Sequence, residues 1–227
     1  KGHKCVESCG KVTAKGGLYA PGIGGGDSSN IQIIGGNIYS TAGSGAAGIG
    51  GSMNKSGTNI EILGGNITAT AGSSGAGIGG GLNGVGRDIT INGGVVIADA
   101  PTDGYGIGSG KGGSSGTVSI LSGNVITKGC YGAVNGTLNL EESELDIVEA
   151  STAYKESYTT TDLVASPSTD SLSSYKYVKF ETSIINVTIT WGALNYKYNQ
   201  GTWNTETLKY DNSGWENVNA EGESDSD

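Results

Sequence analysis

The sequence predicts an all-β protein whose larger part is a right-handed parallel β-helix, a solenoid built from coils of about 29 residues. Two observations support this prediction. Glycine supplies 43 of the 227 residues, while proline supplies three and no three-residue glycine period exists. This composition fits neither a helical fold nor collagen. In addition, three short motifs recur at a nearly constant interval between positions 22 and 125.

The first motif is a short run in which apolar and polar residues alternate. It occurs at residues 30–33, 59–62, 88–91 and 117–120, always at the same interval. Alternation turns one side of each strand toward a shared interior, so we expect a buried ladder made of Ile31, Ile60, Ile89 and Val118. One coil cannot bury its own apolar side, and successive coils must therefore stack at about 4.8 Å.

The other two motifs are rich in glycine. A Gly-Gly corner at residues 35–36 recurs at 64–65 and 93–94, and each corner leads into a second alternating strand. The run Gly-Ile-Gly-Gly at residues 22–25 recurs at 48–51 and 77–80. No Lys-Ser/Thr pair and no helix follows it, so we interpret it as a thin wall of the solenoid rather than as a phosphate-binding loop.

Charge divides the chain into two parts. Residues 141–227 carry a net charge of −11, against +2 for residues 1–140. Without a basic stripe we expect no nucleic-acid partner, and without a long apolar run we expect no membrane insertion. The expected organisation, in residue numbers, is an N-terminal cap at 1–10, a β-helix of about five coils at 11–150, a connector at 151–174, a small antiparallel β module at 175–220 and an acidic tail at 221–227.

Two stretches resemble known surface proteins. The run Gly-Ala-Gly-Ile-Gly-Gly-Gly at residues 75–81 resembles the Gly-rich β-helix repeats of large secreted or wall-anchored proteins of Gram-positive gut bacteria. The Trp-rich stretch at residues 187–215 resembles a short β module that recurs in such proteins. The resemblance implies an extracellular location, at the cell surface or secreted, and it brings no catalytic residues. Among such proteins, immunoglobulin-binding proteins and mucin-glycan adhesins are both candidates.

The residues give little support to catalysis. A β-helix lyase needs a basic residue beside carboxylates, and a hydrolase needs carboxylates from neighbouring coils. The only arginine is Arg87, and the nearest acids, Asp88, Asp99 and Asp103, fall on three different elements of one coil. We expect no catalytic residue, no cofactor and no metal site. A carbohydrate-active enzyme and a purely structural stalk stay open as alternatives.

The three cysteines are an odd number with no redox or zinc spacing. A disulfide among Cys5, Cys9 and Cys130 is left open.

The expected function is a monomeric, non-enzymatic binding or adhesion module that recognises a host macromolecule. Candidate binding residues form an outward row on the second strand, Tyr39, Thr68, Ile97 and Ile126, together with three loop tyrosines, Tyr19, Tyr105 and Tyr131. The aliphatic row favours a protein, such as an immunoglobulin, whereas exposed tyrosines favour a glycan. Alternatively, residues 151–180 run back along the row and cover it.

Overall fold

The computed structural model describes residues 10–114, 116–140, 145–165, 172 and 174–182, together with five short strands between residues 188 and 218. The chain divides into two compact units, Lys1–Thr182 and Ser183–Asp227. The expected N-terminal cap, apart from Gly10, and the expected acidic tail lie outside the described residues.

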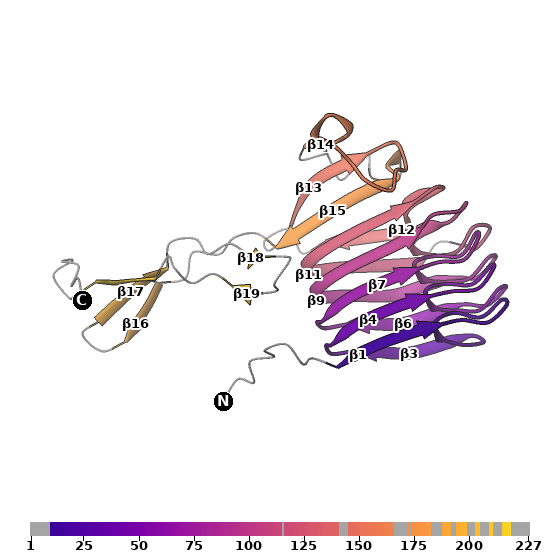
Figure 1. Ribbon diagram of the computed structural model, residues 1–227, viewed down its shortest axis with the longest axis horizontal. Helices are drawn as coiled ribbons and strands as arrows, with labels where there is room; N and C mark the ends of the chain where they lie inside the picture. The colour runs from indigo at the N-terminus through magenta and orange to yellow at the C-terminus, as the bar shows by residue number, and fades with distance from the viewer. Residues whose placement is uncertain are drawn as a thin grey trace. The chain divides into compact units, whose positions relative to one another are not determined.

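The first unit is a parallel β-solenoid with three faces (Figure 1). The first face contains β1 (Lys11–Lys15), β4 (Asn37–Thr41), β7 (Asn66–Thr70) and the second halves of β9 (Gly86–Ala100) and β11 (Gly116–Gly129). The second face contains β2 (Ile23–Gly24), β5 (Ile49–Gly50), β8 (Ile78–Gly79), β10 (Tyr105–Gly108) and the first half of β12 (Gly132–Leu140). The third face contains β3 (Ser28–Ile33), β6 (Gly57–Ile62), the first halves of β9 and β11, and the second half of β12.

The register confirms the repeat. Lys11 pairs with Asn37, and from there the partners on the first face follow at the interval of the sequence repeat as Asn66, Val95 and Asn124. The solenoid has about four turns rather than the expected five. The last turn falls short because β12 adds a rung to the second and third faces only.

A cap of antiparallel strands ends the solenoid. It contains β13 (Leu145–Ser151), the short helical turn η1 (Thr160–Asp162), β14 (Val164–Ala165) and β15 (Tyr177–Thr182). We expected the β-helix to continue to residue 150, but residues 145–150 do not form the next strand of the first face. Strand β15 pairs antiparallel with β11 at that position, and β13 pairs with the other side of β15. An antiparallel strand ends the repeat and covers an edge that would otherwise be unpaired.

Strand β15 also changes the expected division of the chain. Residues 177–182, which we expected in the C-terminal module, pair with the solenoid instead. Residues 151–165 likewise belong to the first unit, where they include η1 and β14. The cap therefore uses residues that carry no repeat signal.

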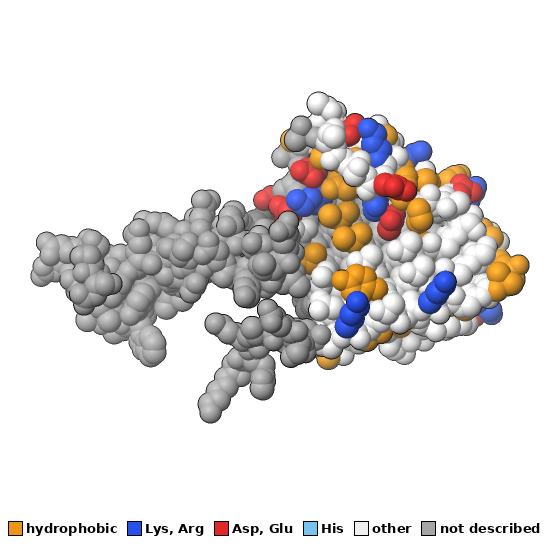
Figure 2. Space-filling model, viewed as in Figure 1, with side chains coloured by type: hydrophobic (Ala, Val, Ile, Leu, Met, Phe, Trp, Pro, Cys, Tyr) orange, Lys and Arg blue, Asp and Glu red, His pale blue; other side chains and the backbone are white. Residues whose placement is uncertain are grey.

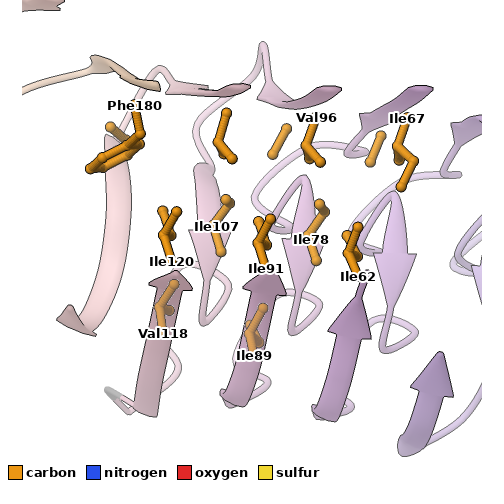
Figure 3. Packing of buried hydrophobic residues seen from close by; sticks show 14 of the residues in the cluster. Ile62, Ile67, Ile78, Ile89, Ile91, Val96, Ile107, Val118, Ile120 and Phe180 are labelled. Carbon is orange, nitrogen blue, oxygen red and sulfur yellow. The ribbon is translucent and has the colours of Figure 1, made fainter. Parts of the chain in front are cut away.

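The interior consists of stacked apolar ladders (Figure 3). Ile60, Ile89 and Val118 are fully buried and stand in register, as expected, while Ile31 on the first rung is only partly buried. The one phenylalanine of the sequence, Phe180, is the largest fully buried side chain and lies opposite Val125. Figure 3 shows it at one end of the ladders, so the cap closes this end of the core.

Steric contacts between turns explain why the Gly-Ile-Gly-Gly motif requires glycine. Gly79 has a φ of +134°, and a Cβ on it would lie 2.0 Å from the carbonyl oxygen of Gly108 on the next turn. A side chain is therefore excluded both by conformation and by space. This confirms the thin wall and explains why the glycine recurs in each turn.

The second unit contains the strands β16 (Thr188–Trp191), β17 (Leu194–Tyr198), β18 (Trp203–Asn204), β19 (Lys209–Tyr210) and β20 (Trp215–Val218). Their described pairs are antiparallel: β17 pairs with β16 and β20, and β18 pairs with β19. Across the described parts of both units, no helix is long and apolar enough to cross a membrane.

Candidate binding surface

The predicted outward row exists on the first face. Tyr39 stands beside Thr68, which is followed in register by Ile97 and Ile126. The next neighbour is Lys179 of β15, so the row runs into the cap. Tyr39 is 42% exposed, and the other three predicted residues are half-buried. Figure 2 shows hydrophobic side chains gathered on this face, with charged groups around those nearest the cap.

The cap covers only part of this row. A groove of about 430 Å³ remains where the row meets the cap. Ile97 and Ile126 line it together with Glu149 of β13, Tyr177 of β15 and residues 156–158 from the segment between these strands. The alternative that residues 151–180 cover the row is therefore only partly right, because Ile97 and Ile126 stay accessible from the groove.

Two tyrosines form an anchored wall of the groove. The ring centroids of Tyr158 and Tyr177 lie 4.2 Å apart at an interplanar angle of 37°. The Tyr158 hydroxyl donates to the carbonyl oxygen of Ala153 at 3.1 Å and accepts from the backbone N–H of Lys155 at 2.9 Å. Burial raises the pKa of both phenols, and the nearby Glu149 charge raises the pKa of Tyr177 further. Both rings therefore stay neutral at physiological pH.

Among the described residues that line the groove, Lys128 is the one lysine, and a neighbouring aspartate neutralises its charge. Lys128 Nζ lies 3.2 Å from a carboxylate oxygen of Asp99, and both side chains are mostly buried. The Tyr154 hydroxyl donates to Asp99 at 2.9 Å, and Lys128 Nζ lies 5.7 Å from the centre of the Tyr154 ring. Burial and the Asp99 charge raise the pKa of Tyr154, so this hydroxyl keeps its proton at neutral pH and the network is satisfied.

Two carboxylates in the groove have no such compensation. Glu149 accepts one long hydrogen bond of 3.4 Å from the Tyr177 hydroxyl, and Glu156 is exposed. Within the described residues neither glutamate forms an ion pair. The groove therefore combines an aliphatic floor, an aromatic wall and uncompensated negative charge.

The structure places two of the predicted loop tyrosines together. Tyr105 and Tyr131 meet edge to face, with ring centroids 5.2 Å apart. Lys111 Nζ lies 4.9 Å from the centre of the Tyr131 ring and forms an ion pair with Asp103. Burial raises the pKa of Tyr105, while Tyr131 is 52% exposed.

The third loop tyrosine, Tyr19, is exposed in the loop after β1, on the first turn. It joins neither this pair nor the groove.

The acids considered for catalysis lie apart. Asp88 lies 3.8 Å from Arg87, Asp99 pairs with Lys128, and Asp103 pairs with Lys111. In the part of the chain that the structure describes, no three His, Cys, Asp or Glu side chains are grouped so as to hold a metal ion.

The cysteines form no disulfide that the structure describes. Cys130 is a free thiol that donates to the carbonyl oxygen of Pro101. Cys5 and Cys9 lie outside the described residues.

Comparison with known families agrees with this architecture. A family model described as "Beta helix repeat" matches residues 10–27, 60–82 and 89–111. The matched residues all lie in the solenoid of the first unit, which is similar to β-helix repeats. Searches of curated proteins and of solved structures found no match to the chain. The likeness to surface proteins of Gram-positive bacteria and to their Trp-rich module stays a prediction from the sequence.

Proposed function

We propose that this β-helix repeat protein is a non-enzymatic, extracellular binding module that holds a macromolecular partner on the first face of its solenoid. The observation that carries the proposal is the groove at the end of the outward row, because its floor of Ile97 and Ile126 stays accessible where the row meets the cap. Accessible apolar surface rimmed by polar groups is typical of interaction sites. The β-helix repeats are consistent with a surface or structural protein.

The contrast between inward and outward positions supports the same function. The inward ladder next to the row, Ile38, Ile67, Val96 and Val125, stays Ile or Val from turn to turn. The outward row, in contrast, changes from Tyr39 through Thr68 to Ile97 and Ile126. The ladders fix the platform, and its outer chemistry is free to specify a ligand.

A binding screen of the whole chain tests the proposal. The chain is tested against immunoglobulins, other extracellular host proteins and a glycan array, first as wild type and then as an Ile97→Ser/Ile126→Ser variant. We expect saturable binding that the double variant weakens at least about tenfold, with little change in melting temperature. The matched control is Ile34→Ser/Leu63→Ser, which removes two exposed aliphatic side chains outside the groove and should bind normally.

Failure to bind any ligand in the screen would favour the structural stalk. If both double variants weaken partner binding equally, the groove is not the binding site.

The absence of catalysis is part of the proposal and has its own assay. The chain is incubated with plant and mucin polysaccharides, and new reducing ends and unsaturated sugars are measured. We expect no turnover above buffer, since Asp88, Asp99 and Asp103 each pair with a separate basic side chain. Turnover that disappears in Asp99→Ala or Asp103→Ala would establish an enzyme instead.

A further inference from the structure

We infer that the groove accepts an arginine or lysine side chain of a polypeptide, so that the partner of the proposed module is a protein with an exposed basic segment. This inference rests on the proposed function and names the ligand class of the same site. Three features of the groove carry it: the floor, the uncompensated charge and the size.

The floor suits an alkyl stem. Ile97 and Ile126 lie side by side on adjacent strands, and Leu163 adds a third aliphatic side chain. Lysine and arginine bury their methylene stems along such surfaces while the charged head reaches polar groups. A sugar ring would instead need an open aromatic face. Here Tyr177 is buried, and the ring of Tyr158 already packs on it.

The charge selects a cation. Lys128 is paired with Asp99, which leaves the carboxylates of Glu149 and Glu156 as the uncompensated charges that line the groove. Carboxylates bind a guanidinium through two parallel hydrogen bonds. The net charge of −9 on the whole chain draws a basic partner from a distance. In Figure 2, acidic and basic side chains both lie beside the hydrophobic side chains near the cap.

The size limits the occupant. A volume of about 430 Å³ is in the lower part of the range of ligand pockets. It suits one or two side chains that project from a partner's surface, and it is small for several sugar residues of a chain.

Methyl NMR of the whole chain tests the inference. The probe is a twelve-residue peptide with two arginines between Gly and Ser spacers, and the matched control replaces both arginines with citrulline, the neutral isostere. We expect saturable shifts of the Ile97 and Ile126 methyl signals with the arginine peptide, and no shift of Ile34. The apparent affinity should fall at least about fivefold with citrulline, and it should also fall when the salt is raised from about 50 to about 300 mM.

The variant pair is Glu149→Gln/Glu156→Gln against Glu61→Gln. Glu61 accepts a hydrogen bond from Gln32 on the third face and does not line the groove. We expect the double variant to lose at least about fivefold in affinity and Glu61→Gln to keep it. An unchanged methyl spectrum shows that each variant is folded.

The inference and the proposed function fail in different ways. If the Ile97 and Ile126 signals do not move at millimolar peptide, or move equally with citrulline, the basic ligand class is overturned. The proposed function still holds if a glycan or an acidic protein from the screen shifts these two signals. If the best ligands of the screen leave both signals unmoved, the groove is not the binding site and both proposals fall.

Discussion

The regular turns and the cap of this solenoid are stabilised in different ways. In the turns, an inward residue such as Ile60 lies between copies of itself, Ile31 on one side and Ile89 on the other. In the cap, Phe180 faces Val125 across an antiparallel pair and no equivalent residue repeats within the described strands. Repetition makes a smooth, closed stack, whereas the irregular cap creates the groove described on the first face. The turns therefore account for the platform, and the cap accounts for the site.

Breaking a ladder should destabilise the protein more than any other single substitution considered below. We predict that Ile60→Asp removes the cooperative thermal transition followed by circular dichroism, because it leaves an unpaired charge in a fully buried stack and costs several kcal/mol. Glu61 is the control, since it is the next residue and its carboxylate faces outward. Glu61→Ala should stay within about 0.5 kcal/mol of wild type. A cooperative melt retained by Ile60→Asp would contradict the ladder.

The cap should respond separately from the turns. Phe180→Ala is expected to cost about 3 to 5 kcal/mol, because it opens a cavity at the end of the core. Urea unfolding measures this loss, and hydrogen exchange should show faster exchange in β15 and β13 than in β7. Lys176→Ala, in the residue just before β15, is the matched control with little expected effect. Uniformly faster exchange in all turns would mean that cap and turns unfold as one unit.

The repeat made most of the fold predictable. Ile60, Ile89 and Val118 could be assigned to the core because each has a copy one coil away, and Ile97 and Ile126 followed as outward residues by alternation. The cap could not be predicted in this way. The pairing of β15 with β11 joins residues 125 and 180, and no local pattern encodes such a distant antiparallel contact.

The groove residues that come from the cap could not be predicted for the same reason. Glu149, Glu156, Tyr158 and Tyr177 all come from the cap, where no repeat reveals which side chains meet.

A repeated pair of asparagines is a further signal in the sequence, and our predictions did not use it. Asn54 and Asn83 recur one coil apart, and both have positive φ values, of 61° and 58°.

These stacked asparagines give a smaller, local test of the turns. The Asn83 side chain donates to that of Asn54 at 2.9 Å, and asparagine tolerates the left-handed backbone better than alanine. We predict that Asn83→Ala costs about 1 to 2 kcal/mol, from the lost hydrogen bond and the strained backbone together. Asn83→Gly should cost less because glycine adopts this conformation freely. If urea unfolding shows that both variants lose the same free energy of unfolding, backbone strain does not contribute to the cost.

Low pH should have a small, local effect on the stability of the cap. Hydrogen bonds from Lys155 and from the backbone N–H of Thr159 lower the pKa of Asp162 from 3.8 to about 2. A lowered folded-state pKa adds stability above pH 4, and this contribution is lost as the pH falls toward 2. We predict that local opening of η1, measured by hydrogen exchange, increases over this window in wild type and varies less in Asp162→Asn. A carboxyl titration of Asp162 near pH 4 would contradict these contacts.

The cap and its groove both depend on the pairing of β15 with β11, since this pairing ends the ladders and provides a wall of the groove. Hydrogen exchange of the whole chain, read by mass spectrometry on peptides covering residues 177–182 and 124–129, tests it most directly. We predict that β15 amides exchange nearly as slowly as those of β11, and that Phe180→Ala speeds up exchange in β15 first. If β15 exchanges within seconds while β11 stays protected, the cap and its groove are not formed as described.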